Sequence, residues 1–196
     1  FGVTSPRVFA DYIAFCQEKN KSRIIKYYFR SKAKGWGHTE ETVYENKKRD
    51  YKSVLSQAYK ELFHSKLCLR FSCYNCKYTN FQRPSDITIG DYWGIEDCLP
   101  NFNDKLGISV IIINTFKGKS VFSHFEKWLD STPSNINDCS AKQRNLCKPT
   151  PQNPKRKEFW ADYSKHGFSY ILRKYTRYGV KRRAKGFLIQ ILRKTH

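Results

Sequence analysis

The sequence contains no methionine and no long apolar run. It begins with Phe1 and Gly2, so position 1 is not a translation start and we expect a piece of a longer chain. The longest apolar run, over 108–114, has the length of a strand, whereas a membrane-spanning helix needs roughly 18 apolar residues. We therefore expect no transmembrane segment, and no secretory signal peptide is visible.

Acidic residues are scarce. The chain has 17 Asp+Glu against 37 Lys+Arg, a net charge of +20, and residues 140–196 hold 16 basic residues but only two acidic ones. Apolar residues alternate with Lys and Arg at helical spacing in this tail, which predicts a basic amphipathic helix. Such a helix could dock on an anionic membrane surface, pack on another domain or partner, or remain solvated. We do not favour nucleic acid as its partner.

The remaining composition is that of a folded domain. Hydrophobic residues make up 39% and aromatic residues 16% of the chain, which argues against disorder although the mean hydropathy is −0.71. Apolar periodicity predicts helices over 4–18, 52–64 and 119–129, and strands over 22–30, 42–45, 86–91 and 107–114, the last buried on both faces. The predicted fold class is α/β (mixed α+β), with the core ending near residue 131. Residues 1–152 would form the main domain, and 153–196 the basic helical extension, interrupted at Gly167 and Gly179.

Seven cysteines in a chain without a secretory signal argue against a disulfide framework. Cys16 lies on the apolar face of the first predicted helix and is expected to be a buried thiol. Cys68, Cys73 and Cys76 follow one another at a spacing that lets neighbouring sulfurs converge on one metal ion or cluster. Plant-type [2Fe–2S] ferredoxins have this spacing, and tetrahedral zinc would accept it. Three structural cysteines are the alternative.

A zinc ion or a four-iron cluster needs a fourth ligand. Cys98 is the nearest candidate, with a buried thiol as the alternative interpretation. His64 is a weaker candidate because a single histidine at a helix end is more often a surface or capping residue. The missing ligand could also come from a part of the parent chain outside this sequence.

Four stretches resemble a known family. They read GVTSPRVFADY over 2–12, LCLRFSCYNCK over 67–77, RPSDITIGDYWGI over 83–95 and DKLGIS over 104–109. Together they are similar to the C-terminal domain of the coenzyme F-420 hydrogenase/dehydrogenase beta subunit family. The resemblance extends over about residues 1–165. The motif sequences are most similar to the branch of the family found in bacterial capsular and exopolysaccharide gene clusters.

The resemblance implies an iron-sulfur flavoprotein oxidoreductase. Such a protein would pass electrons between a reduced deazaflavin, or another two-electron donor, and one-electron carriers. The implied cofactors are a 4Fe-4S cluster and FAD, with coenzyme F-420 as a further candidate. Ferredoxin-like and flavin-binding elements are expected upstream in the parent chain, so this piece alone would not hold flavin. The expected location is cytoplasmic, with the tail on the inner membrane face.

The resemblance also implies site residues. Cys68, Cys73 and Cys76 match the cysteines of the family pattern and become the expected cluster ligands. The stretch near the flavin would comprise Asp86, Thr88, Gly90, Asp91, Trp93 and Gly94. Here glycines would allow close backbone approach, Trp93 could stack on a ring, and a carboxylate could orient ring-edge donors. The alternative is an ordinary strand and turn with a buried tryptophan.

Three residues form a weaker candidate site, a phosphate-facing loop before the last strand: Lys105, Gly107 and Ser109. No histidine sits beside a matched carboxylate in any motif, so the sequence predicts no catalytic base. Two other functions stay open. One is a zinc-stabilised basic module that binds nucleic acid without catalysis, and the other is a family member that keeps the fold as an interaction subunit.

Overall fold

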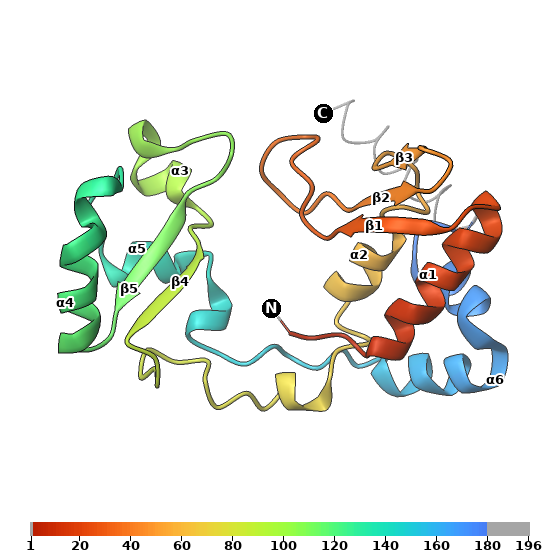
Figure 1. Cartoon of the computed structure of the whole chain (residues 1–196). Coiled ribbons are helices and arrows are strands. Elements are labelled where there is room, and N and C mark those ends of the chain that lie inside the picture. Colours follow the sequence, from red (N-terminus) through yellow and green to blue (C-terminus); the bar gives the residue numbers. More distant parts are fainter. Residues whose placement is uncertain (1, 180–196) are drawn as a thin grey trace, which may run out of the picture. The chain divides into compact units, whose positions relative to one another are not determined.

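The structure is a computed structural model that describes residues 2–179 (Figure 1). By internal contacts the chain forms two compact units. We call residues 2–74 with the segment from Pro151 onward the terminal body, and residues 75–150 the central body. None of the described helices has both the length and the hydropathy that a membrane crossing requires.

The terminal body combines three α-helices with one small sheet. Its elements are α1 (Pro6–Asn20), β1 (Ile24–Tyr28), β2 (Glu41–Tyr44), β3 (Arg49–Asp50), α2 (Ala58–His64), a 3₁₀ turn at Phe71–Cys73, and α6 (Arg156–Tyr175). The strands form an antiparallel sheet in the order β1-β2-β3. The register pairs Tyr28 with Glu41 and Thr42 with Asp50.

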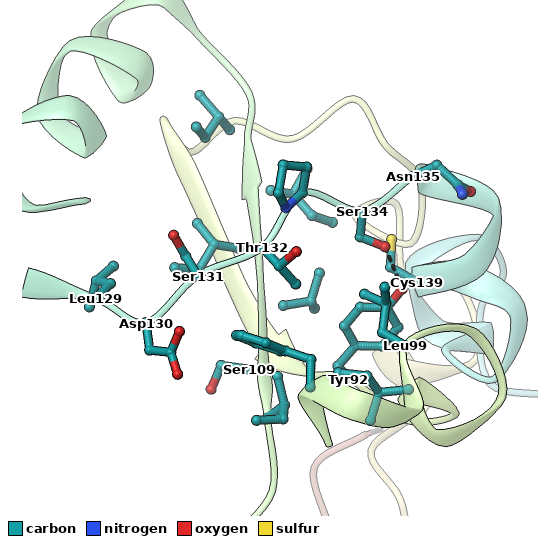
Figure 2. Close-up of a pocket in the computed structure, with 18 of the residues that line it drawn as sticks. Tyr92, Leu99, Ser109, Leu129, Asp130, Ser131, Thr132, Ser134, Asn135 and Cys139 are labelled. Atoms are coloured by element: carbon teal, nitrogen blue, oxygen red, sulfur yellow. Dashed lines mark hydrogen bonds between the residues drawn. The ribbon is translucent and has the colours of Figure 1, made fainter. Parts of the chain in front are cut away.

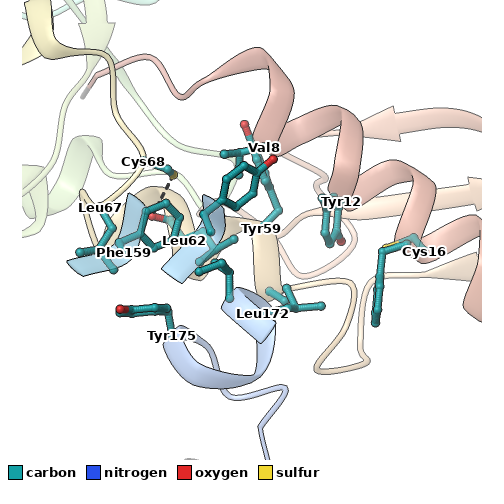
Figure 3. Close-up of a cluster of buried hydrophobic side chains, with 14 residues drawn as sticks. Val8, Tyr12, Cys16, Tyr59, Leu62, Leu67, Cys68, Phe159, Leu172 and Tyr175 are labelled. Carbon is teal, nitrogen blue, oxygen red and sulfur yellow. Dashed lines mark hydrogen bonds between the residues drawn. The ribbon is translucent and has the colours of Figure 1, made fainter. Parts of the chain in front are cut away.

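Apolar faces of α1, α2 and α6 meet in one core (Figure 3). Val8 and Tyr12 of α1, Leu62 of α2 and Phe159 of α6 are fully buried. Each such side chain contributes about 1.5–3 kcal/mol by leaving water. Cys16 is also fully buried in this core, which confirms its predicted structural role.

The predicted basic helix is present as α6, and its apolar side packs into the core of the terminal body. Gly167 adopts a left-handed φ of 75° that kinks the helix, as its place in the sequence indicated. Beyond the kink, Ile171 and Leu172 are fully buried in the terminal body. The rest of the predicted amphipathic segment, 180–196, lies outside the described residues, so membrane docking by the tail stays a prediction.

The central body has its own sheet and core. Its elements are β4 (Ile87–Asp91), α3 (Ile95–Cys98), β5 (Ser109–Ile113), α4 (Phe116–Phe125), α5 (Ile136–Ala141), and 3₁₀ turns at Pro100–Phe102, Glu126–Trp128 and Arg144–Leu146. Strands β4 and β5 pair antiparallel, Ile87 opposite Ile113 and Asp91 opposite Ser109. Tyr92, Ile95, Val110 and Cys139 form its buried cluster.

The structure confirms a mixed α and β fold with a C-terminal helix and corrects three expected elements. The strand over 107–114 is not buried on both faces: β5 has β4 as its one strand partner among the described residues, and Ile113 is 39% exposed. The helix expected over 52–64 is formed only from Ala58 onward. The helix expected from 119 begins at Phe116, because the Thr115 hydroxyl accepts the Gly118 N–H and caps it earlier.

The core also does not end near residue 131. The stretch over 132–137 leads into α5, which begins at Ile136 and whose Cys139 is buried in the central body. The chain returns to the terminal body only after Thr150. A functional division into residues 1–152 and 153–196 stays a prediction.

Candidate functional site

The central body contains a cavity of about 680 Å³ (Figure 2). Strand β5, helix α3 and the segment 129–136 line it. Most of the wall is aliphatic or aromatic, including Ile95, Leu99, Phe102 and Val110. A cavity of this size with apolar walls is in the range of small-molecule sites.

Tyr92 holds one wall in place. It directly follows β4, is buried, and its backbone N–H donates to the carbonyl of Ile108 at 2.9 Å. Its hydroxyl shares a hydrogen bond of 2.5 Å with the hydroxyl of Ser134 and contacts the Cys98 sulfur at 3.4 Å. Burial raises the pKa of Tyr92 to about 12, so the phenol is neutral at physiological pH. The bond to Ser134 fixes the 129–136 segment along the cavity (Figure 2).

Polar groups also line this cavity. Glu126 and Asp130 supply carboxylates, and Ser109, Ser131 and Thr132 supply hydroxyls. The cavity therefore combines an apolar wall with groups that accept hydrogen bonds. This arrangement suits a flat, largely apolar ring that carries donors on one edge. It does not suit a phosphate group, because the carboxylates would repel it.

The six predicted cofactor-binding residues do not line the cavity. Asp86 accepts a hydrogen bond from the Thr115 hydroxyl at 2.6 Å and pairs with Lys117 at 3.4 Å. The hydrogen bond from Thr115, with the nearby lysine, lowers the pKa of Asp86. Thr88 accepts the side-chain amide of Asn114 at 3.0 Å. In this structure the two residues join β4 to the junction of β5 and α4.

The other four predicted residues continue β4 into α3. Gly94 has a φ of 90°, a conformation that favours glycine, and an added Cβ would also displace the flexible side chain of Lys142, 2.8 Å away. Gly90 has no such need, because its added Cβ would make an ordinary contact of 3.7 Å with Val110. The carbonyl of Asp91 accepts a hydrogen bond from the Gln143 amide, and Trp93 is half-buried.

Sequence reasoning passed over Tyr92 between two motif residues and treated the 132–137 stretch as the end of the core. Two residues of the weaker predicted loop, Gly107 and Ser109, do line the cavity. The alternation in β4 gave no signal for Tyr92, because this residue shares a face with Thr88 and Gly90 and not with the apolar Ile87 and Ile89. In the structure that face is the inner one, since Gly90 lies opposite Val110 and Ile89 is 69% exposed. No local pattern pointed to residues 129–136.

The four predicted metal ligands lie in different surroundings. Cys68 is fully buried in the terminal core and donates to the Leu62 carbonyl at 3.5 Å, and burial raises its pKa to about 12. Cys73 is half-buried, and its sulfur accepts the N–H of Val3 at 3.2 Å. Cys76 is half-buried at the start of the central body. Cys98 donates to the carbonyls of Gly94 and Ile95.

The predicted ligand set is divided between the two bodies, with Cys68 and Cys73 in one and Cys76 and Cys98 in the other. Within residues 2–179 no group of three or more His, Cys, Asp or Glu side chains is arranged to hold a metal ion. Cys73 and Cys76 are each partly exposed, and the Cys73 sulfur accepts a backbone N–H. Cys68 would first have to leave the core and give up its bond to Leu62.

A cation lies next to this segment. The Arg156 guanidinium is 5.4 Å from the ring centroids of both Tyr74 and Trp160, and it donates to the Leu69 carbonyl at 3.0 Å. The charge of Arg156 acts to lower the pKa of Cys68, but the larger effect of burial outweighs it.

The sequence was also compared with known proteins. Neither the curated proteins nor the solved structures include a match. A family model for the C terminus of the coenzyme F420 hydrogenase/dehydrogenase, beta subunit, matches residues 1–134. The matched range includes α1, the cysteine segment, both strands of the central sheet and most of the cavity wall. This chain therefore belongs to the coenzyme F420 hydrogenase/dehydrogenase beta subunit family, through its C-terminal domain, and is an oxidoreductase-related protein.

Proposed function

We propose that the chain is part of an iron-sulfur flavoprotein oxidoreductase that passes electrons between a reduced flavin-type or deazaflavin-type donor and iron-sulfur centres. The family match over residues 1–134 carries this proposal. The cavity beside the matched RPSDITIGDYWGI stretch supports it. We also propose a polysaccharide-biosynthesis context, from the wording of the motifs.

The cavity is the proposed place for the ring of the donor. Its apolar walls would exclude water from a flat ring, and Ser109, Glu126 and Asp130 would accept hydrogen bonds from ring-edge donors. When bound, a flavin-type ring supplies two-electron chemistry and can also release electrons singly. The protein's part is to hold the ring, keep water out and orient its polar edge. The neutral phenol of Tyr92 keeps the wall in position through Ser134.

A ring-binding titration tests this part of the proposal. Riboflavin, FAD and coenzyme F-420 are titrated into the full-length parent chain, because this piece alone is not expected to hold flavin, and their fluorescence is followed. We expect saturable binding that the Ser131→Trp variant weakens tenfold or more, about 1.4 kcal/mol, because the indole fills the cavity from its exposed segment. Ser123→Trp, on the exposed side of α4 away from the cavity, is the control. If both variants are folded and bind the ring equally well, the ring does not bind in this cavity.

Cys73 and Cys76 are the proposed cluster ligands that the structure leaves accessible, and Cys68 and Cys98 complete the proposed set. The test is iron and acid-labile sulfide content after anaerobic reconstitution, with the visible spectrum. We expect Cys73→Ser and Cys76→Ser to reduce both contents, while Cys147→Ser, an exposed thiol outside the set, leaves them unchanged. Stoichiometric zinc without sulfide would contradict the proposal.

Cys68 needs a separate readout because its burial gives it a structural role as well. We expect Cys68→Ser to lower the free energy of unfolding of the iron-free chain by about 1–3 kcal/mol, since a more polar group replaces a thiol in the core. Denaturant unfolding without iron measures this loss. If Cys68→Ser leaves the stability unchanged and iron is lost, the thiol of Cys68 serves as a ligand and does not stabilise the core.

The proposed partners are upstream ferredoxin-like and flavin-binding elements of the parent chain. An anionic membrane surface is a second proposed partner, through the tail beyond the described residues. Vesicle co-sedimentation of the full chain, with and without anionic lipid, tests the second.

A further inference from the structure

Strand β5 has an open edge that faces the cavity of the central body. Its one strand partner among the described residues is β4. The cavity is lined by every residue from 107 to 113. Because side chains of a strand alternate between the two faces of a sheet, a wall made of consecutive residues is the edge of a strand and not one of its faces.

The hydrogen bonds at the two ends of the β4–β5 ladder show which backbone groups reach this edge. The N–H of Tyr92 donates to the carbonyl of Ile108, and the N–H of Asn114 donates to the carbonyl of Asp86, both at 2.9 Å. The register between these two pairs contains no shift. Hydrogen-bonded and non-bonded pairs alternate in an antiparallel sheet. The groups that bond to β4 are therefore those of every second residue of β5.

The alternation divides β5 into two sets of backbone groups. Val110 and Ile112 bond to β4, whereas the N–H and C=O groups of Ser109, Ile111 and Ile113 point to the open edge. Within residues 2–179 no backbone group bonds to these three from that side. Ser109 and Ile113 are exposed, but Ile111 is half-buried. Ile111 therefore has the outward N–H and C=O that most need a partner other than water.

This edge lacks the usual protection of an edge strand. The sequence of β5, SVIII, contains no charge and no proline, and its register with β4 has no bulge. The segment 129–136 lines the same cavity and is held by the hydrogen bond between Tyr92 and Ser134 (Figure 2). The space beside the edge is thus a cavity of about 680 Å³. A space of this size fits a small molecule, which we expect there in preference to a further strand.

We propose that the open edge of β5 at Ile111 recognises a cyclic imide, an N–H flanked by two carbonyls, on the ring of the donor. The N–H and C=O of one strand residue point the same way, so they can donate to a ring carbonyl and accept from the adjacent ring N–H, as a partner strand would. Flavin-type and deazaflavin-type rings both carry such an edge. The inference rests on the proposed function, and it adds a backbone donor that the carboxylates of Glu126 and Asp130 do not supply.

The first test compares lumiflavin with N3-methyllumiflavin, whose ring lacks the imide proton. Both are titrated into the flavin-free, full-length parent chain, and their fluorescence is followed. We expect lumiflavin to bind at least about tenfold more tightly, because the methyl group leaves the Ile111 carbonyl without a donor. Equal affinities would overturn imide recognition and leave the ring in the cavity. Binding of neither ring would overturn both this inference and the proposed donor site.

Two proline variants test the backbone group itself. Ile111→Pro removes an N–H at the cavity but no bond to β4, and proline is tolerated where a strand N–H points away from the ladder. Ile89→Pro is the matched control, because Ile89 pairs opposite Ile111 and its N–H points to the other edge of the sheet, outside the cavity.

We expect Ile111→Pro to weaken lumiflavin binding at least about fivefold and Ile89→Pro to leave it unchanged, with thermal unfolding as the check of folding. Equal losses in both variants, or no loss in either, would overturn the assignment to the β5 edge. Should Ile111→Pro fail to fold, the comparison of the two rings still decides.

Hydrogen exchange of single amides tests the edge without any substitution. In the flavin-free parent chain we expect the Ile111 amide to exchange at least about tenfold faster than those of Val110 and Ile112, which bond to β4. Lumiflavin should slow exchange at Ile111 towards the rates of these neighbours. Equal protection of all three amides before lumiflavin is added, or no slowing when it is bound, would overturn the proposal.

Discussion

At the scale of single residues, Glu40 is the most unusual acid described. Its side chain is buried near the phenols of Tyr12 and Tyr27. Burial raises its pKa to about 7, although the nearby Tyr27 hydroxyl and the backbone N–H of Lys60 partly oppose the shift. Between the ordinary value of 4.5 and about 7, the folded chain therefore keeps a proton at Glu40 that the unfolded chain has lost.

Glu40 thus makes the fold less stable as pH rises through this window. We expect Glu40→Gln to remove this loss of stability. At pH 8 the variant should be more stable than the unmodified chain by on the order of 1–3 kcal/mol, with no gain near pH 4. Urea unfolding of both chains at the two pH values measures the difference. Glu45→Gln, an exposed acid just after β2, should show no such pH dependence. A gain at pH 4 equal to that at pH 8 would refute the titration of Glu40.

At the scale of elements, the contact of α4 with β4 depends on one glycine. An added Cβ at Gly118 would clash with the backbone carbonyl group of Asp86, lying 2.9 Å from its carbon and closer still to its oxygen. Backbone cannot move away cheaply, so we expect Gly118→Ala to cost about 1–3 kcal/mol of unfolding free energy. At Gly90 of β4 the added methyl makes only an ordinary contact. Gly90→Ala should therefore change the free energy of unfolding by no more than about 0.5 kcal/mol.

The pair of variants also separates structure from cofactor binding. If Gly90 permits close approach of a cofactor, as the family pattern implies, Gly90→Ala keeps its stability and loses ring affinity. Thermal unfolding and the fluorescence titration, run on the same samples, give both values. Unchanged affinity in a stable Gly90→Ala variant would assign Gly90 to the sheet alone.

At the scale of the whole molecule, two separate cores coexist in one chain. The terminal core holds the fully buried Leu172 of α6, and the central cluster shares no residue with it. We expect Leu172→Ala to cost about 2–5 kcal/mol and to speed amide exchange in α1 and α2, but not in β4 and β5. Arg173→Ala, its exposed neighbour, is the control. Faster exchange everywhere would mean that the two bodies unfold as one unit.

Elements with a strong local signal were predictable from the sequence. The Ser5-Pro6 start and the apolar spacing of α1, the alternation in β4 and the break at Gly167 each depend on residues close in the chain. The start of α4 was misplaced because its cap, Thr115, precedes a glycine that interrupts the apolar period. The exposure of Ile113 could not be predicted, because an apolar run in the sequence does not determine how many neighbouring strands or helices cover that strand.

The candidate site divides in the same way. The sequence by itself determined the family, the cysteine spacing and the motif beside the cavity, because these reside in contiguous residues. Only the tertiary structure decided that Tyr92 and residues 129–136 line a cavity and that Cys68 points into a core. Each of these depends on segments far apart in the chain, whose contacts are set by packing and burial and not by local pattern.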